Sequence, residues 1–148
     1  MNVLVSACLL GENCKYSGGN NLCPELLAWL EREGHRAVPV CPEVLGGLPV
    51  PRPPAEIVDG VVRTRDGKSV DQEFRRGAAL ALEIAQREGA ELAVLQPRSP
   101  SCGPRQVYDG TFSGRRVDGR GVFAALLLEN GFRVLEPRGC LQTPKTLS

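Results

Sequence analysis

Residues 69–95, SVDQEFRRGAALALEIAQREGAELAVL, contain the pattern that decides the fold. The stretch predicts a helix over residues 69–88, which opens with a Ser-x-x-Gln capping box formed by Ser69 and Gln72. Its apolar side chains recur close to the 3.6-residue period of a helix. Gly89 is expected to end the helix, and the apolar run at 92–95 is typical of a strand that is buried on both faces. A helix, a glycine and a short apolar strand in succession indicate one unit of an α/β fold.

The same order of elements occurs twice more along the chain. The helices expected there end at Gly34 and Gly131, and a short apolar strand follows each glycine. The sequence also opens on an apolar strand. We therefore expect three helices, over 24–33, 69–88 and 121–130, and four strands, over 2–6, 36–40, 92–95 and 132–135. Such alternation predicts a parallel sheet with right-handed crossovers.

The predicted fold class is α/β. We expect a single-domain three-layer sandwich over residues 1–148, with a mainly parallel, four-stranded, Rossmann-like sheet. A small extra hairpin is expected from residues 56–58 and 61–63, which turn at Asp59-Gly60. Residues 137–148 are expected to form a loosely ordered tail.

Composition excludes several classes of partner. The formal net charge is +1, aromatic residues make up only 5% of the chain, and basic residues form no stripe with them. Because nucleic-acid binding depends on clustered Lys and Arg, no nucleic-acid partner is expected. No apolar run approaches the roughly 20 residues that span a bilayer, so no membrane partner is expected either. The N-terminus lacks the charged start of a signal peptide, which predicts a cytoplasmic protein with reduced cysteines.

Three of the six cysteines follow strands of the predicted sheet. Cys8 lies just past the first strand, Cys41 just past the second, and Cys102 in the loop after the third. In an open parallel sheet, ligands bind outside the carboxyl ends of the strands. A single free cysteine is more often a small buried hydrophobic residue. Three of them at three matching strand ends favour a catalytic or metal-binding pocket.

The donor types narrow the choice of metal. Thiolates select zinc, Cu(I) or iron–sulfur clusters, and a structural zinc site usually shows a close Cys pair, which this chain lacks. His35 is expected in an exposed turn at the opposite edge of the sheet. Cys14 is a candidate fourth ligand, whereas Cys23 and Cys140 are expected to be incidental. The sequence therefore predicts an open site with three thiolates, either an iron–sulfur cluster with one free iron or a zinc ion with one water.

Four short motifs occur in order along the chain: SACLLG at 6–11, VCPEV at 40–44 with GLPVPR at 47–52, SPSCG at 99–103, and YDGTFSG at 108–114. The ordered set resembles the thiouracil desulfidase family, long catalogued as a domain of unknown function. The resemblance covers about residues 2–136.

The resemblance implies a 4Fe–4S cluster held by Cys8, Cys41 and Cys102. It also implies removal of sulfur from a thiolated pyrimidine base such as 2-thiouracil, which gives uracil and sulfide. In the mechanism suggested for the family, the free iron takes the substrate's sulfur, and a carboxylate and a serine move protons and activate water. Carried onto this sequence, the carboxylate is Glu43, and the serine is Ser99, with Ser101 as second choice.

Each of these residues also has a plainer interpretation. Glu43 in an enclosed site should have a raised pKa suited to acid–base work, but it could equally be a helix-capping or solvated acid. Ser99 could be a turn serine before proline. Arg52 and Arg98 could offset the charge of a cluster or substrate, or form ordinary surface salt bridges.

The aromatic residues and one loop bear on the substrate. Tyr16 and Phe112 could stack on a base, although core packing is the expected role of Phe112. After Tyr16 the family usually has an Asp followed by basic residues, whereas this chain has SGGNN at 17–21. That difference bears on which thiolated compound the site takes.

Two other functions compete with the desulfidase. One is a metal-free sulfurtransferase that carries a persulfide on a single cysteine. The other is a non-catalytic module that binds zinc or a cluster.

Overall fold

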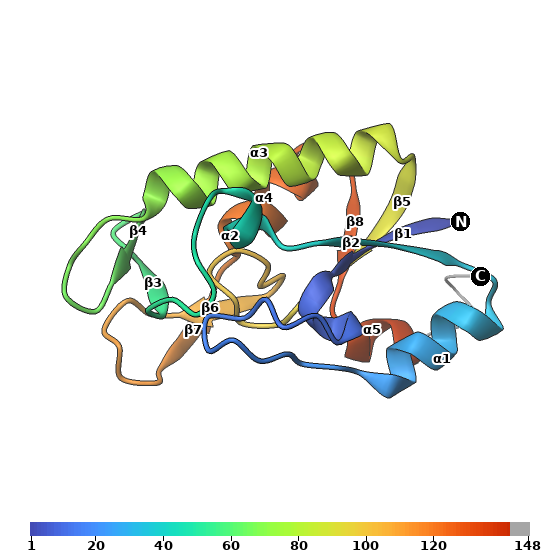
Figure 1. Ribbon diagram of the computed structural model, residues 1–148, viewed down its shortest axis with the longest axis horizontal. Coiled ribbons are helices and arrows are strands. Elements are labelled where there is room, and N and C mark those ends of the chain that lie inside the picture. Colours follow the sequence, from blue (N-terminus) through green and yellow to red (C-terminus); the bar gives the residue numbers. More distant parts are fainter. Residues whose placement is uncertain (143–148) are drawn as a thin grey trace.

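A four-stranded parallel sheet forms the centre of the computed structural model, which describes residues 1–142 (Figure 1). Its strands lie in the order β2-β1-β5-β8, and every pair is parallel. The bounds are β1 Asn2–Ser6, β2 Arg36–Val40, β5 Ala90–Val94 and β8 Arg133–Leu135. The chain reverses its direction across the sheet after β2, so β1 and β5 flank the switch point where ligands bind in such folds.

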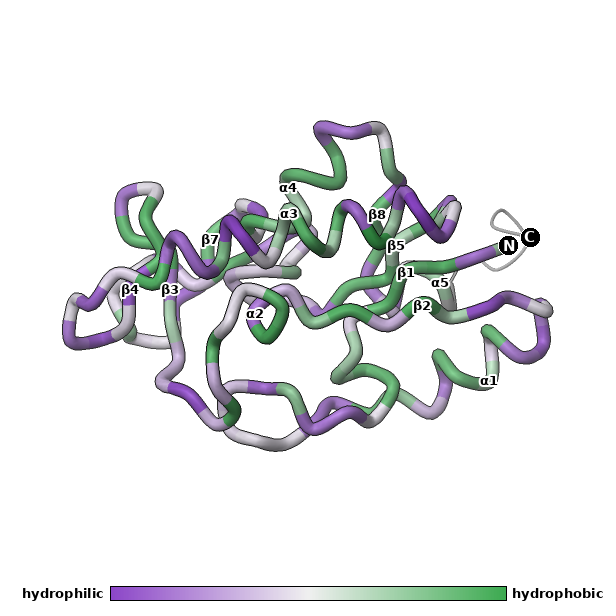
Figure 2. Tube along the Cα trace, turned by 45° about the horizontal axis from the view of Figure 1, so that its top comes forward, coloured by the Kyte–Doolittle hydropathy of each residue, from purple (hydrophilic) through white to green (hydrophobic). Residues whose placement is uncertain are grey.

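Helices cover both faces of this sheet, which confirms the three-layer α/β fold (Figure 1). One face carries α3 (Asp71–Arg87) and α4 (Val122–Glu129), and the other carries α1 (Pro24–Arg32) and α5 (Pro137–Gln142). Successive residues of a strand point to opposite faces, so Leu4 joins the cluster under α3, while Val3 and Val5 join the cluster around Trp29 of α1. Figure 2 shows the matching pattern, with β1 and β5 mainly hydrophobic and α3 alternating along its length.

The expected capping box at the start of α3 is wrong. The helix begins at Asp71, and the Ser69 hydroxyl accepts a hydrogen bond from the Asp71 amide at 3.4 Å. The reason is tertiary pairing. Ser69 forms a bridge with Arg63, and the Val70 amide donates to the Val62 carbonyl, so this stretch is extended beside a strand.

The prediction of a loosely ordered tail from residue 137 is also wrong for residues 137–142. Residues 137–142 form α5, and Cys140 within it is fully buried in the cluster under α1. Residues 143–148 lie outside the described part of the chain.

Two hairpins and two short helices complete the fold. The expected hairpin is present as β3 (Ala55–Val58) and β4 (Val61–Thr64). A second hairpin, β6 (Gln106–Tyr108) and β7 (Arg116–Asp118), was not predicted. Neither were the 3-10 helix η1 (Ala7–Leu10) after β1 and the single turn α2 (Pro42–Leu45) after β2. Within residues 1–142, no helix has the length and apolar character needed to cross a membrane.

Candidate functional site

A cavity of about 560 Å³ lies at the carboxyl edge of the sheet and is lined by Cys8, Cys41 and Cys102. Cys8 lies in η1, Cys41 caps the start of α2, and Cys102 lies in the loop after β5. All three are free thiols. Glu43 and Ser99 line the same cavity. The structure therefore brings five of the six predicted site residues to one place.

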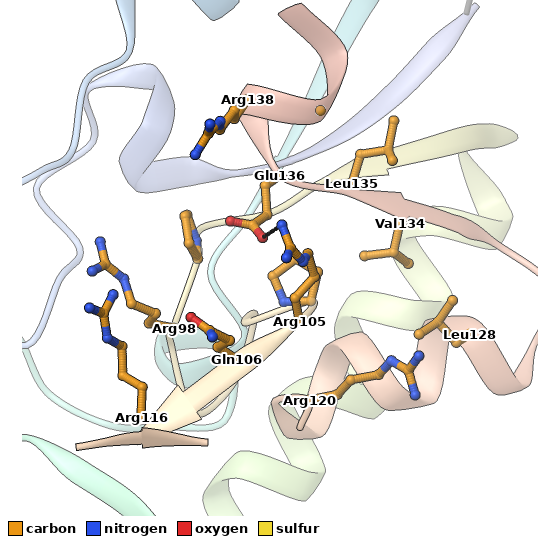
Figure 3. Close-up of a pocket in the computed structure, with 13 residues that line it drawn as sticks. Arg98, Arg105, Gln106, Arg116, Arg120, Leu128, Val134, Leu135, Glu136 and Arg138 are labelled. Atoms are coloured by element: carbon orange, nitrogen blue, oxygen red, sulfur yellow. Dashed lines mark ion pairs between the residues drawn. The ribbon is translucent and has the colours of Figure 1, made fainter. Parts of the chain in front are cut away.

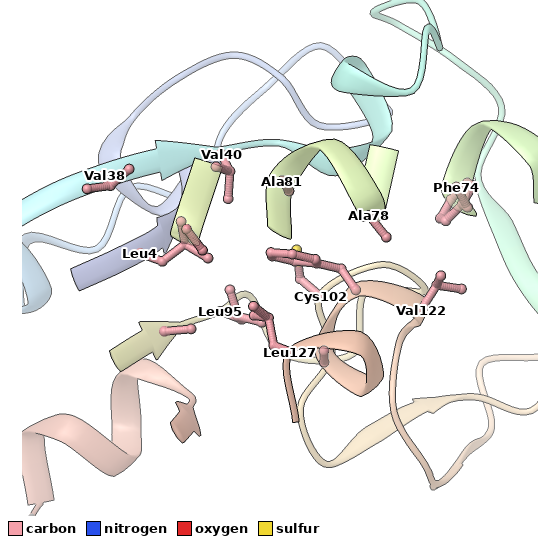
Figure 4. Close-up of a cluster of buried hydrophobic side chains, with 14 of the residues drawn as sticks. Leu4, Val38, Val40, Phe74, Ala78, Ala81, Leu95, Cys102, Val122 and Leu127 are labelled. Atoms are coloured by element: carbon pink, nitrogen blue, oxygen red, sulfur yellow. The ribbon is translucent and has the colours of Figure 1, made fainter. Parts of the chain in front are cut away.

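The thiols differ in their surroundings. Cys102 is 5% exposed and belongs to the hydrophobic cluster under α3 (Figure 4), and burial raises its pKa to about 12. A hydrogen bond with Cys14 raises the pKa of Cys41, and burial adds to the effect. A hydrogen bond with Cys14 instead lowers the pKa of Cys8. Cys14, the candidate fourth ligand, thus lies against two of the three thiols.

The donor set suits an iron–sulfur cluster, because three free cysteine thiols line one cavity. Within residues 1–142, no group of three or more His, Cys, Asp or Glu side chains is arranged to hold one metal ion. A single zinc ion needs its sulfur ligands at about 2.3 Å from one point. A cluster binds each thiolate at a different iron, so its ligands stand further apart, and sulfur is the donor that such clusters take.

His35 lies away from the cavity, as expected, but it is not an exposed turn residue. Its ring is half-buried and packs on Trp29 at 5.0 Å between centroids, and its Nδ1 lies 3.2 Å from the N-terminal amine.

Two glycines place α2, and hence Cys41 and Glu43. A Cβ on Gly77 of α3 would lie 1.7 Å from the Pro42 carbonyl oxygen, and one on Gly46 would lie 1.9 Å from the Glu73 carbonyl oxygen. The backbones of α2 and α3 are therefore in direct contact, which only glycine at both positions allows.

Arg52 organises the wall beside Glu43. Its side chain is 4% exposed, and its Nε donates to Glu43 Oε1 at 3.0 Å. The same guanidinium donates to the carbonyls of Cys14 at 2.9 Å and Pro49 at 3.2 Å. Burial raises the pKa of the Glu43 carboxyl, and Arg52 opposes this effect. The surface salt bridge and the solvated acid considered from the sequence are both wrong, because Arg52 is buried and the Glu43 side chain is only 17% exposed.

The two candidate serines occupy different positions. Ser99 lines the cavity, and its hydroxyl oxygen accepts hydrogen bonds from the amides of Ser101 at 3.1 Å and Cys102 at 3.0 Å. Ser101 is 2% exposed and lies behind the cavity wall, with its Oγ 3.8 Å from Cys102 Sγ. A Cβ on Gly121, at the start of α4, would lie 2.4 Å from the Ser101 carbonyl oxygen, so this loop rests directly on α4.

A second cavity of about 850 Å³ adjoins the first and shares Pro97 and Arg98 with it. Figure 3 shows arginines from several elements around it, with Glu136 paired to Arg105 at 3.8 Å. It is larger than the thiol cavity, but cysteines do not line it. The candidate chemistry therefore belongs to the smaller cavity.

Comparison with known proteins agrees with this geometry. Residues 3–138 match the family described as 2-thiouracil desulfurase. The chain belongs to this family. It is 38% identical over 143 residues to an uncharacterized protein, YbbK, of Bacillus subtilis (strain 168), which covers 90% of this chain and 93% of that one. A solved structure titled "[4Fe-4S]-dependent thiouracil desulfidase TudS" is 41% identical, with a TM-score of 0.90 over 99% of this chain and 97% of its own.

Several residues that line this cavity were not singled out from the sequence. Asn21 lines the cavity, with its Nδ2 4.0 Å from Cys8 Sγ, and it belongs to the stretch where this chain departs from the family pattern. Glu56 and Arg65 also line the cavity, and both come from the β3–β4 hairpin region. Phe112 lies in the cavity wall and is half-buried, so the core packing expected for it is wrong.

Proposed function

We propose that this protein is an iron–sulfur-dependent desulfidase that removes sulfur from a small thiolated base such as 2-thiouracil and yields uracil and sulfide. The observation that carries the proposal is the convergence of three free thiols, from the ends of three strands, on a cavity that also contains a buried carboxyl and a hydroxyl. Membership of the family and the likeness to a [4Fe-4S]-dependent desulfidase support it. Thiolate ligands of this kind suit a reducing compartment such as the cytoplasm.

Cys8, Cys41 and Cys102 would hold a 4Fe–4S cluster. When bound, such a cluster supplies an iron with an open position, which acts as a Lewis acid toward a soft thiocarbonyl sulfur. Three protein thiolates would leave one iron of the cluster without a protein ligand, and the substrate would bind there. The cavity volume of about 560 Å³ lies within the usual range for small-molecule sites.

Glu43 is proposed as the general base and acid. Burial raises the pKa of its carboxyl above the usual range, and Arg52 opposes this effect, which suits a group that takes and returns a proton. Arg52 holds Oε1 at 3.0 Å and fixes the direction of the carboxyl. Glu43 would take a proton from the water that attacks the thiocarbonyl carbon.

Ser99 is proposed as the second proton-handling group, with Ser101 as the alternative. The Ser99 oxygen already accepts from two backbone amides, so its own proton is free to be donated into the cavity. The net reaction replaces the C=S bond with C=O, consumes one water and releases one hydrogen sulfide. No electrons are gained or lost overall, so no external reductant is needed.

The decisive experiment is reconstitution without oxygen, followed by measurement of iron, acid-labile sulfide and turnover of 2-thiouracil. We expect about four iron and four sulfide per chain, in line with a 4Fe–4S cluster, and release of sulfide with uracil. Cys102→Ser should lose most of the cluster and all turnover. Cys23→Ser is the matched control, because Cys23 is a thiol outside the cavity that contacts Glu25. Glu43→Gln should retain the cluster and lose turnover.

The competing functions give different results. A sulfurtransferase would work without iron and depend on one cysteine alone. A non-catalytic module would bind metal but release no sulfide, and Glu43→Gln would change nothing measurable. Bound zinc, or a full cluster in the Cys102→Ser variant, would contradict the ligand assignment.

A further inference from the structure

The loop between β6 and β7, residues 109–115, forms one wall of the thiol cavity. Phe112 at its tip and Gly114 beside it line the cavity together with the three thiols. Phe112 has a backbone φ of 56°, a left-handed conformation that residues other than glycine rarely adopt. Such a conformation persists only where the surroundings impose it, so the contacts of this loop identify what holds Phe112 in place.

A single carboxylate oxygen carries much of this constraint. Glu56 Oε1, on β3, accepts hydrogen bonds from the amides of Gly110 at 2.9 Å and Phe112 at 3.2 Å. A Cβ on Gly110 would lie 2.7 Å from the Ile57 carbonyl oxygen, so the loop backbone rests directly on β3. The neighbouring bonds within the loop join Thr111 to Asp109. Glu56 therefore ties the Phe112 backbone to the β3–β4 hairpin.

Arg65 holds the same residue and directly follows β4, the strand that pairs with β3. Its guanidinium donates to the Phe112 carbonyl at 3.2 Å and lies 5.4 Å from the centre of the Phe112 ring. Figure 1 shows the two hairpins side by side, away from the central sheet. Phe112 is thus held by its amide, its carbonyl and its ring, while the ring remains part of the cavity wall.

We propose that Glu56 and Arg65 are positioning residues that hold the Phe112 ring where it stacks on the substrate, and that this ring selects a flat aromatic base. The proposal rests on the proposed function, because it assigns the substrate class of the same cavity. An aromatic side chain can stack on any nucleobase. It needs a planar partner, however, because the attraction comes from the overlap of two ring faces. The polar groups around the thiols would form hydrogen bonds with the edge of the base.

The test compares uracil with 5,6-dihydrouracil, which has the same amide and carbonyl groups but a puckered, non-aromatic ring. Neither contains the thiocarbonyl sulfur, so binding is measured without turnover, by calorimetry on protein reconstituted without oxygen. We expect the unmodified protein to bind uracil about tenfold more tightly than dihydrouracil, from the usual contribution of stacking. Phe112→Leu should reduce this preference to less than about threefold, because leucine fills the wall without a π face.

Glu56→Ala should reduce the preference to the same extent, because it removes the acceptor that holds the Gly110 and Phe112 amides. Glu56→Gln keeps an acceptor oxygen and should restore most of the preference. The double variant Glu56→Ala with Phe112→Leu should lose no more than Phe112→Leu alone, since both changes remove one interaction. Glu83→Ala is the matched control, because Glu83 is an exposed acid on α3 outside both cavities.

Steady-state kinetics provide a second test of the positioning role of Glu56. In Glu56→Ala the KM for 2-thiouracil should rise about tenfold with kcat changed less than threefold, whereas a loss of general folding would lower the active fraction and hence kcat. Phe112→Leu leaves every Glu56 bond in place and so tests the ring even if Glu56→Ala does not fold.

An unmodified protein that shows no preference for uracil over dihydrouracil would overturn the proposal. So would Glu56→Ala with the full preference, or additive losses in the double variant. Absence of sulfide release with the ring preference intact would instead contradict the proposed reaction and leave the role of Phe112 standing.

Discussion

Gly77→Ala is the substitution that best tests how the site is placed. In an isolated helix this change is favourable by about 1 kcal/mol, because alanine is the better helix former. Here the added methyl would lie 1.7 Å from the Pro42 carbonyl oxygen and 2.7 Å from its carbon. Neither atom belongs to a flexible side chain, so the helices α2 and α3 must separate by more than about 1 Å to relieve the contact.

The expected result is a net loss of stability. Overpacking of this kind costs about 1–3 kcal/mol, and contact with backbone on the far side places this case at the upper end. After the gain in helix propensity, we expect a free energy of unfolding lower by about 2 kcal/mol. For a chain of this size that corresponds to a midpoint lower by about 4–8 °C. Because α2 carries Glu43 and begins just after Cys41, cluster content should fall as well.

Urea unfolding and thermal melting followed by circular dichroism would measure the stability, and iron content would report the site. Ala79→Gly is the control, since Ala79 is exposed on the same helix and the change should cost only the propensity of about 1 kcal/mol. Gly77→Ala with stability equal to or above that of the unmodified protein would show that the close contact between α2 and α3 does not position the site.

Two further predictions concern buried and partly buried charges. Arg52→Lys should lower the free energy of unfolding by about 2–4 kcal/mol in urea titrations, because a lysine cannot reach all three acceptors and a buried Glu43 loses its partner. Full stability in Arg52→Lys would mean that the three guanidinium bonds are dispensable. Asp71 accepts from the Val62 amide at 3.0 Å and from Arg75 at 3.3 Å, and these bonds outweigh its partial burial and lower its pKa. Its stabilisation is therefore complete above the unfolded pKa and lost as the pH falls through the lower folded value, so Asp71→Ala should cost about 1 kcal/mol at pH 7 and progressively less below about pH 4. A difference that stays constant from pH 7 to pH 3 would contradict that assignment.

The sequence was sufficient for the central sheet because each strand and long helix has its own period or apolar run. The short elements were not predicted because they lack such a signal. The single turn α2 is too short for a period to show, and the three-residue strands β6 and β7 contain no apolar run. The start of α3 was predicted wrongly because Ser69 pairs with Arg63, a tertiary contact that competes with capping and that local pattern does not reveal.

Some features of the site could likewise be predicted from the sequence, and others could not. The convergence of the cysteines follows from strand order alone, since the carboxyl ends of parallel strands meet at one edge. The burial of Arg52 does not, because it depends on acceptors from three separate segments of chain. From the sequence, Phe112 was a candidate for stacking on a base, but core packing was expected for it, because its place in the wall requires the unpredicted β6–β7 hairpin to lie against β3.

Each cysteine of the candidate site is placed by backbone contacts. The close contact of α2 with α3 at Gly77 sets the position of Cys41. The close contact of its loop with α4 at Gly121 sets the position of Cys102. Cys8 is held through its carbonyl, which accepts from the amides of Gly11 at 3.2 Å and Asn21 at 2.9 Å. Backbone packing of this kind fixes where the three ligands lie, so binding has to order only their side chains, which favours binding of a cluster by three thiolates. Substitution of Gly77 or Gly121 by a larger residue should therefore weaken cluster binding, although neither residue is a ligand. Substitutions at exposed positions on the same helices should not affect it.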